Sequence, residues 1–114
     1  MLKATSEDIK IELRALAHKL EEEHREKLTK ISHPILVAIE LPHSSVRVLF
    51  LVGEGKIKEV HQEDLSDSKI YLGYREFKKL LEKPQKILQY LASGRVRIKG
   101  DLRRVLSSLE VLSE

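Results

Sequence analysis

The sequence predicts an α+β domain in which helices pack on a mostly antiparallel five-stranded sheet. Helical and extended segments follow one another in the order α-β-β-β-β-α-α-β-α, whereas a parallel α/β fold would alternate them. The 114 residues fit one domain, so we expect residues 1–114 to form a single unit. Leu, Ile and Val account for 36 residues, which is too much aliphatic content for a disordered chain.

The first segment, residues 5–31, has the pattern of one long helix. Thr5 or Ser6 can cap its N-terminus, and the pair His33-Pro34 ends it, because the residue before a proline avoids helical geometry. Apolar residues recur at helical spacing along one stripe, which consists of Ile9, Leu13, Leu16, Leu20, Leu28 and Ile31.

Four short strands are predicted after this helix. Residues 35–41, 46–52 and 56–60 are joined by short turns, which is typical of an antiparallel meander. A polar stretch, residues 63–68, leads to the fourth strand at 69–72. The first two strands are apolar on both faces, so the face away from the C-terminal helices needs a cover of its own. We expect the first helix or a partner subunit to supply that cover.

The last part of the chain returns to helices, with one more strand among them. Residues 75–82 are predicted as a helix, and Pro84 begins another that Gly94 ends. Residues 95–99 alternate basic and apolar side chains, as a strand does. Asp101 is a suitable N-cap for the final helix. The apolar face of that helix, expected to lie in the core around Leu106, consists of Leu102, Val105, Leu106 and Leu109.

This C-terminal half has a recognisable order of segments. A short strand at 68–72 precedes a small helix and a Pro-initiated helix, and the motif Gly94-Arg95-Val96-Arg97-Ile98-Lys99-Gly100-Asp101 joins the last strand to the last helix. This order, and the motif above all, resembles the sterol carrier protein 2 family of lipid-binding domains. The resemblance implies an apolar tunnel between helices and sheet. Family members usually carry a Gly-Lys pair between the two small helices; the link Glu82-Lys83-Pro84 is shorter and lacks the glycine, which predicts a reshaped ligand entrance.

The composition excludes several classes of protein. The chain has no cysteine and therefore no disulfide or thiolate chemistry. Its apolar runs are far shorter than the about 20 residues that span a bilayer, and its N-terminus lacks the apolar region of a secretory signal. We therefore expect a cytoplasmic protein. Charged residues make up 34% of the chain and Asn is absent, as in many proteins of heat-loving organisms.

No set of residues has the spacing of a catalytic or metal site. His18 and His24 are six residues apart and do not share a helix face. The turn Gly53-Glu54-Gly55 lacks the third glycine and the Lys-Ser/Thr pair of a phosphate-binding loop. We expect no enzymatic activity, no cofactor and no bound metal.

A basic stripe, which consists of Arg95, Arg97, Lys99 and Lys69, is predicted on the last two strands. The simplest interpretation is the solvent face of an edge strand, where charges prevent unwanted pairing. Contact with anionic lipid head groups is an alternative. Nucleic acid is not expected as a partner, because the net charge is only +3 and Tyr71 alone could stack on a base.

The aliphatic excess and the resemblance together predict a non-catalytic lipid-binding or lipid-transfer domain. It would hold a hydrophobic ligand, fatty-acyl or sterol-like, between the sheet and the C-terminal helices and make transient contact with an anionic membrane surface. The alternative is a ligand-free structural or regulatory interaction module of the same fold, which forms a homodimer through the second sheet face. The residues expected to line the tunnel are Val48, Phe50, Ile70, Leu72, Phe77, Leu81, Leu88, Leu91, Ile98, Leu106 and Leu109.

Overall fold

Five strands form a single sheet in the order β3-β2-β1-β4-β5. A computed structural model describes residues 6–113 of the chain, with side chains as far as residue 110. Neighbouring strands run antiparallel except β1 and β4, which are parallel, so the predicted α+β class with a mostly antiparallel sheet is confirmed. The strands are β1 (Ile35–Glu40), β2 (Arg47–Gly53), β3 (Lys56–Val60), β4 (Lys69–Gly73) and β5 (Val96–Lys99).

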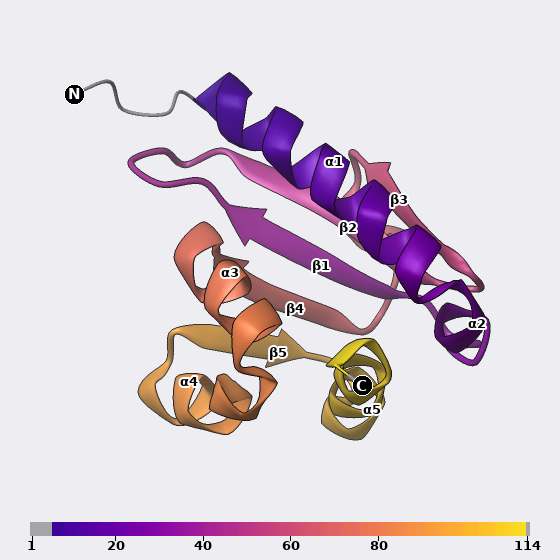
Figure 1. Ribbon diagram of the computed structural model, residues 1–114. Helices are drawn as coiled ribbons and strands as arrows, with labels where there is room; N and C mark the ends of the chain where they lie inside the picture. Colours follow the sequence, from indigo (N-terminus) through magenta and orange to yellow (C-terminus); the bar gives the residue numbers. More distant parts are fainter. Residues whose placement is uncertain (1–5, 114) are drawn as a thin grey trace.

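Five α-helices and two short 3₁₀ segments complete the described part of the chain (Figure 1). The prediction of one helix over residues 5–31 is wrong, because the helix breaks at His24, whose φ of −119° and ψ of 22° leave helical geometry. Ser6 begins the first helix, and Thr5 lies outside the described residues. The elements are α1 (Ser6–Glu23), α2 (Arg25–Leu28), η1 (Glu63–Leu65), α3 (Tyr74–Glu82), η2 (Pro84–Lys86), α4 (Ile87–Ser93) and α5 (Leu102–Ser113).

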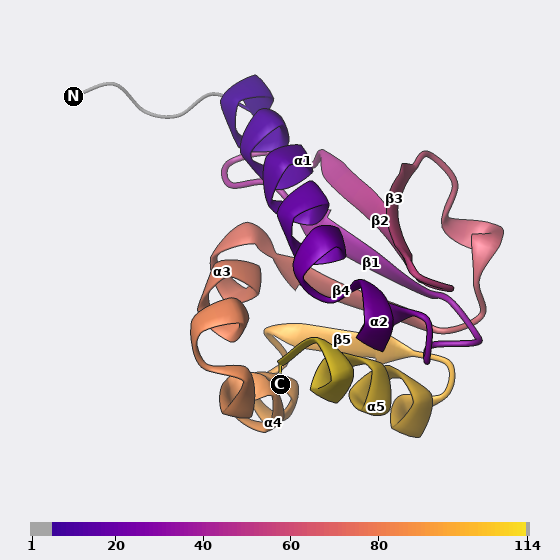
Figure 2. The ribbon, with the colours of Figure 1, turned by 45° about the vertical axis from the view of Figure 1, so that its right-hand side comes forward.

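The helices cover one face of the sheet, here called the first face. Strand residues that point to this face share one core with apolar residues of α1, α2, α4 and α5. Figures 1 and 2 show α1 on the same side of the sheet as α3 and α5, and in Figure 1 it lies over β2 and β3. Strand alternation produces this core, because Val37 pairs with Phe50 and with Ile70 and all three point to the first face.

The opposite, second face is not covered by the first helix, which was one of the two covers suggested by the sequence. The connection between β3 and β4, residues 61–68, runs along it, on the side of the sheet away from α1 (Figure 2). At one end Arg47 lies 3.3 Å from the Glu63 carboxylate. At the other end the Ser66 hydroxyl donates to the Pro34 carbonyl at 2.6 Å. This connection explains how a small second core, made of Leu36, Ala38 and Leu49, is buried without α1.

The ends of the last helices follow the predicted signals, with one correction in the core. Gly94 ends α4 in the left-handed conformation, with φ +78°, and the Asp101 carboxylate accepts a hydrogen bond of 3.1 Å from the Arg104 amide. The prediction that Leu106 is a core position of the last helix is wrong. Val105 is fully buried, whereas Leu106 is only half-buried, because the helix is turned so that Val105 faces the sheet.

Candidate functional site

An apolar cavity of about 120 Å³ lies between the first face of the sheet and the helices. Its floor comes from β1, β2 and β4, whose inward-pointing side chains stand opposite one another in register. Its walls come from α1, α3, η2, the start of α4, α5 and β3. The floor residues are Val37, Ile39, Phe50, Val52, Ile70 and Leu72, and the wall residues are Leu13, Ala17, Leu20, Ile57, Phe77, Leu80, Leu81, Pro84, Ile87 and Leu109.

Every residue that lines this cavity is apolar, so the cavity has no charge or side-chain hydrogen bond to offer. An apolar cavity of about 150 Å³ stays dry and is large enough to bind benzene. The cavity therefore suits an apolar ligand and is ill-suited to ordered water. Leu81 is the one lining residue with an exposed side chain, 40% accessible, which places the opening of the cavity beside the end of α3.

A polar cluster, here called the clasp, joins α1 to α3 next to the cavity. The Glu12 carboxylate accepts hydrogen bonds of 2.6 Å from the Tyr74 hydroxyl and from the Lys78 ammonium group. Their neighbours Leu13 and Phe77 both line the cavity. The clasp thus ties two cavity walls together.

The clasp shifts the titration of all three groups. Hydrogen bonds from Lys78 and Tyr74 lower the pKa of Glu12, and the same carboxylate raises the pKa of Lys78. Burial raises the pKa of Tyr74, and its bond to Glu12 adds to the effect. Each shift favours the charge state in which the clasp is closed at neutral pH, with Glu12 ionised and Lys78 protonated.

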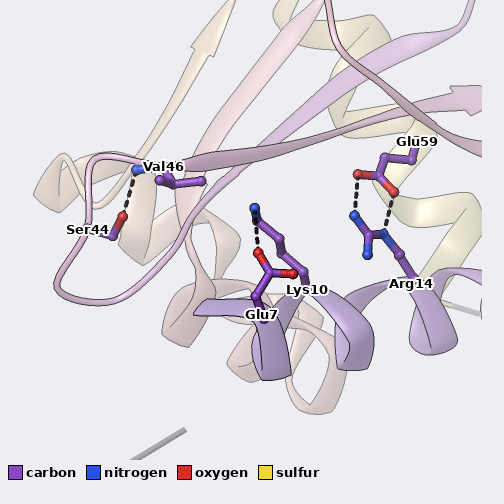
Figure 3. Close-up of polar contacts among 6 residues, drawn as sticks. All are labelled: Glu7, Lys10, Arg14, Ser44, Val46 and Glu59. Carbon is purple, nitrogen blue, oxygen red and sulfur yellow. Dashed lines mark hydrogen bonds and ion pairs between the residues drawn. The ribbon is translucent and has the colours of Figure 1, made fainter. Parts of the chain in front are cut away.

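Two further contacts hold α1 against the edge strand β3. The Arg14 guanidinium donates to both oxygens of Glu59, at 2.7 and 3.3 Å (Figure 3). This bond lowers the pKa of Glu59. The Glu21 carboxylate accepts a hydrogen bond of 2.8 Å from the backbone amide of Ile57, a group that an edge strand would otherwise leave unpaired. The α1 wall of the cavity is therefore fixed along its length.

The structure brings six of the eleven predicted tunnel residues to the cavity: Phe50, Ile70, Leu72, Phe77, Leu81 and Leu109.

The other five predicted residues do not line the cavity. Val48 is buried in the same core, and Leu91 and Ile98 pack partly buried against it. Leu106 is half-buried on α5. Leu88 points to solvent and is 66% exposed, because α4 turns Ile87 and Tyr90 inward instead.

Sequence reasoning missed the contribution of α1 to the cavity. Leu13 and Leu20 were visible as part of its apolar stripe, but the stripe alone does not tell which face of the sheet the helix covers. Ala17 lies on the same side of the helix, where its small side chain leaves space. The spacing of Leu13, Ala17 and Leu20 was the available signal.

The basic stripe lies on the second face, away from the cavity. Lys69 and Lys99 are directly opposite in the β4–β5 register, as are Tyr71 and Arg97. The guanidinium groups of Arg47 and Arg97 lie 5.5 and 5.9 Å from the centre of the Tyr71 ring, within the range of cation–π interactions. A groove of about 390 Å³ beside this ring is lined by both basic and acidic side chains, Glu40 and Glu76 among them.

The described residues, 6–113, offer neither a metal site nor a membrane span. No group of three His, Asp or Glu side chains within this range is arranged to hold a metal ion. No helix within it is long and apolar enough to cross a membrane.

Comparison with known proteins relates this fold to lipid carriers. The model of the SCP-2 sterol transfer family matches residues 13–112. The sterol carrier protein domain 2 of Helicoverpa armigera is similar in structure, with 14% identity and a TM-score of 0.65 over 99% of this chain and 95% of that one. Sterol carrier protein 2 like 2 from Aedes aegypti has 15% identity and a TM-score of 0.64 over 87% and 98%.

The apo form of sterol carrier protein 2 from Yarrowia lipolytica gives 12% identity and a TM-score of 0.63 over 82% of this chain and 77% of that one. No curated protein sequence matches this chain. At these identities the similarity to solved structures shows the fold alone.

Proposed function

Because the chain belongs to the SCP-2 sterol transfer family, we propose that it works as a single-domain, non-catalytic carrier of a fatty-acyl or sterol-like lipid. The observation that supports this most strongly is the cavity between sheet and helices, whose lining is entirely apolar. The ligand would lie on the floor formed by Phe50, Ile70 and Leu72 and enter beside Leu81.

The proposed mechanism is partition between cavity and membrane. Each methylene group removed from water contributes about 0.8 kcal/mol, and a bilayer offers nearly the same gain. The difference in free energy between the two environments is therefore small. A ligand can leave either one without a large thermodynamic barrier, which is what a carrier requires. Exchange with an anionic membrane surface is part of this proposal.

A long ligand requires the cavity to widen. The volume of about 120 Å³ is below the about 150 Å³ that accommodates benzene, so a complete acyl chain needs additional space. The walls from η2 and α5 are the ones that can supply it, since their lining residues Pro84 and Leu109 are only partly buried and neither wall is joined to α1 by the clasp. The α1 wall is held by the clasp and by the Arg14–Glu59 pair.

A ligand-free interaction module that forms a homodimer is the second candidate. Leu51, Val60 and Tyr71 remain partly exposed at the margin of the second core, and a second copy of the chain could cover them. The short link Glu82-Lys83-Pro84 also favours a small cavity. A cytoplasmic location and a heat-adapted source are parts of the proposal that rest on composition.

Displacement of a fluorescent fatty acid tests the proposed function. We expect the purified protein to bind the probe at micromolar concentration and to release it when unlabelled fatty acid, acyl-CoA or sterol is added. The competitor that displaces it best identifies the ligand class. Absence of binding by all three classes, together with a dimer in sedimentation, would contradict the carrier and support the interaction module.

A further inference from the structure

Two of the four exposed leucines in the described part of the chain lie at the corner between α3 and α4. Leu81 is 40% exposed and also lines the cavity. Leu88 is 66% exposed and follows Ile87, another lining residue. Pro84, between them, lines the cavity as well. The segment 79–88, here called the α3–α4 corner, therefore carries exposed apolar side chains at the opening of an apolar cavity.

The same corner is basic. Lys79, Lys83 and Lys86 occur within it, against a single acidic residue, Glu82. Glu82 lies 3.9 Å from Lys79, so that pair largely neutralises itself. Lys83 and Lys86 form no ion pair with residues 6–113. Lysine stems can lie along an apolar surface while their ammonium groups reach outward to phosphates.

We propose that the α3–α4 corner docks on the surface of an anionic bilayer, with Leu81 and Leu88 in the acyl boundary and Lys83 and Lys86 on lipid phosphates. This inference rests on the proposed lipid-carrier function and names the partner surface for it. Apolar side chains ringed by lysines are the combination that binds such surfaces. Docking here turns the opening beside Leu81 toward the membrane, so that a lipid passes into the cavity without crossing bulk water.

The basic stripe on the second face is the less suitable surface. Arg97 and Lys99 lie on β5 and Arg95 directly precedes it. Arg95 and Arg97 flank the groove beside Tyr71, and none of the three residues lines the cavity. That groove includes two carboxylates, Glu40 and Glu76, which an anionic surface would repel. Docking through the stripe would also hold the cavity opening away from the bilayer.

Co-sedimentation with vesicles tests the proposal on the full chain. Vesicles of equal parts phosphatidylcholine and phosphatidylglycerol are compared with vesicles of phosphatidylcholine alone. We expect wild-type protein to bind the anionic vesicles and to be released by salt, since surface charge interactions are screened. Leu88→Ser, and separately Lys83→Glu combined with Lys86→Glu, should weaken this binding by about tenfold.

Two matched variants serve as controls. Ile11→Ser removes an equally exposed side chain, 61% accessible, on the side of α1 that points away from the cavity. Arg95→Glu combined with Arg97→Glu reverses two charges on the second face. Both should bind vesicles like wild type. Unchanged binding by the corner variants, or an equal loss in the Arg95/Arg97 variant, would overturn the proposal.

Failure of this inference can be distinguished from failure of the proposed function. Leu88 does not line the cavity, so Leu88→Ser should still bind the fluorescent fatty acid in the absence of vesicles. If wild type binds the fatty acid and the corner variants bind vesicles normally, only the docking surface is wrong. If wild type binds no lipid ligand at all, the carrier function itself is wrong.

Discussion

Glu12 joins two walls of the cavity through a single carboxylate. It accepts hydrogen bonds from Lys78 and Tyr74, and the pKa of Glu12 lies below its ordinary value of 4.5 because of them. A carboxylate whose pKa is lowered on folding stabilises the folded state above its unfolded pKa. This contribution is lost as the pH falls through the lowered folded value. The clasp is therefore closed at neutral pH and weakens only in acid.

Glu12→Gln tests this contribution. We expect the variant to lose about 0.5 kcal/mol of unfolding free energy at neutral pH, a small effect because the group is well exposed to solvent. The difference from wild type should shrink as the pH falls below 4.5, where Glu12 of the unfolded chain becomes protonated, and disappear once the pH is below the lowered pKa of folded Glu12. Urea unfolding at a series of pH values measures the difference in unfolding free energy between Glu12→Gln and wild type.

Glu26→Gln is the matched control, since Glu26 is an exposed glutamate on α2 and takes no part in the clasp. It should follow the wild-type curve at every pH. A Glu12→Gln curve that runs parallel to wild type at all pH values would show that the clasp does not contribute as described.

Among the elements, α5 shows that local sequence predicts the ends of a helix but not which of its faces is buried. Asp101 was predictable as its N-cap and Gly94 as the end of α4, because capping depends on residue type and adjacent backbone. Which of Val105 and Leu106 faces the sheet was not predictable. Both are apolar, and their positions differ only by the rotation of the helix, which tertiary packing decides.

Truncating Val105 and Leu106 to alanine, one at a time, tests which of the two side chains α5 turns toward the sheet. Val105→Ala should destabilise the protein by about 2 kcal/mol, because it empties a fully buried site. Leu106→Ala should cost about 1 kcal/mol although it removes more atoms, since its side chain is only half-buried. Thermal or urea unfolding compares them. A larger loss for Leu106→Ala would mean that the helix packs through the other face.

The cap of α5 is open to a separate test. Asp101→Ala removes the acceptor of the Arg104 amide and should cost about 1 kcal/mol. Asp101→Asn keeps an acceptor oxygen at the same place and is expected to retain most of the stability. Equal losses in both variants would point to the charge rather than the cap.

The break between α1 and α2 at His24 could not be predicted from the spacing of apolar residues. The apolar stripe of the N-terminal segment skips position 24 but returns at the helical period at Leu28 and Ile31, so the period alone predicts one continuous helix. Leu28 is fully buried in the first-face core, and the chain must turn toward β1 to place it there. That requirement comes from the position of the sheet and is not written into the local sequence.

At the scale of the whole molecule, the sequence predicted part of the cavity floor and part of its walls, but not the wall that α1 supplies. Phe50, Ile70 and Leu72 were predicted because inward positions in a strand follow a period of two. The cover of the second face was missed, since residues 61–68 are polar and carry no periodic signal. Their path follows from the strand order, in which β4 lies beside β1 and the chain must cross from β3 to reach it.

If the cavity is the lipid site, lipid binding depends on the space above Ala17. Ala17 is buried, lines the cavity and lies on α1, while Ala15, two residues earlier, is exposed on the same helix. A large side chain at position 17 fills the cavity, whereas the same side chain at position 15 enters solvent. The two positions are therefore a matched pair for the same substitution.

Titration of a fluorescent fatty acid into Ala17→Phe and Ala15→Phe is the most direct measurement. Ala17→Leu is included as a smaller step that the core tolerates more readily, and circular dichroism confirms that each variant is folded. We predict that Ala15→Phe binds the fatty acid like wild type and that Ala17→Leu binds it more weakly. The affinity of Ala17→Phe should fall by about tenfold or more. Equal affinity in folded Ala17→Phe and Ala15→Phe would contradict the assignment of this cavity as the lipid site.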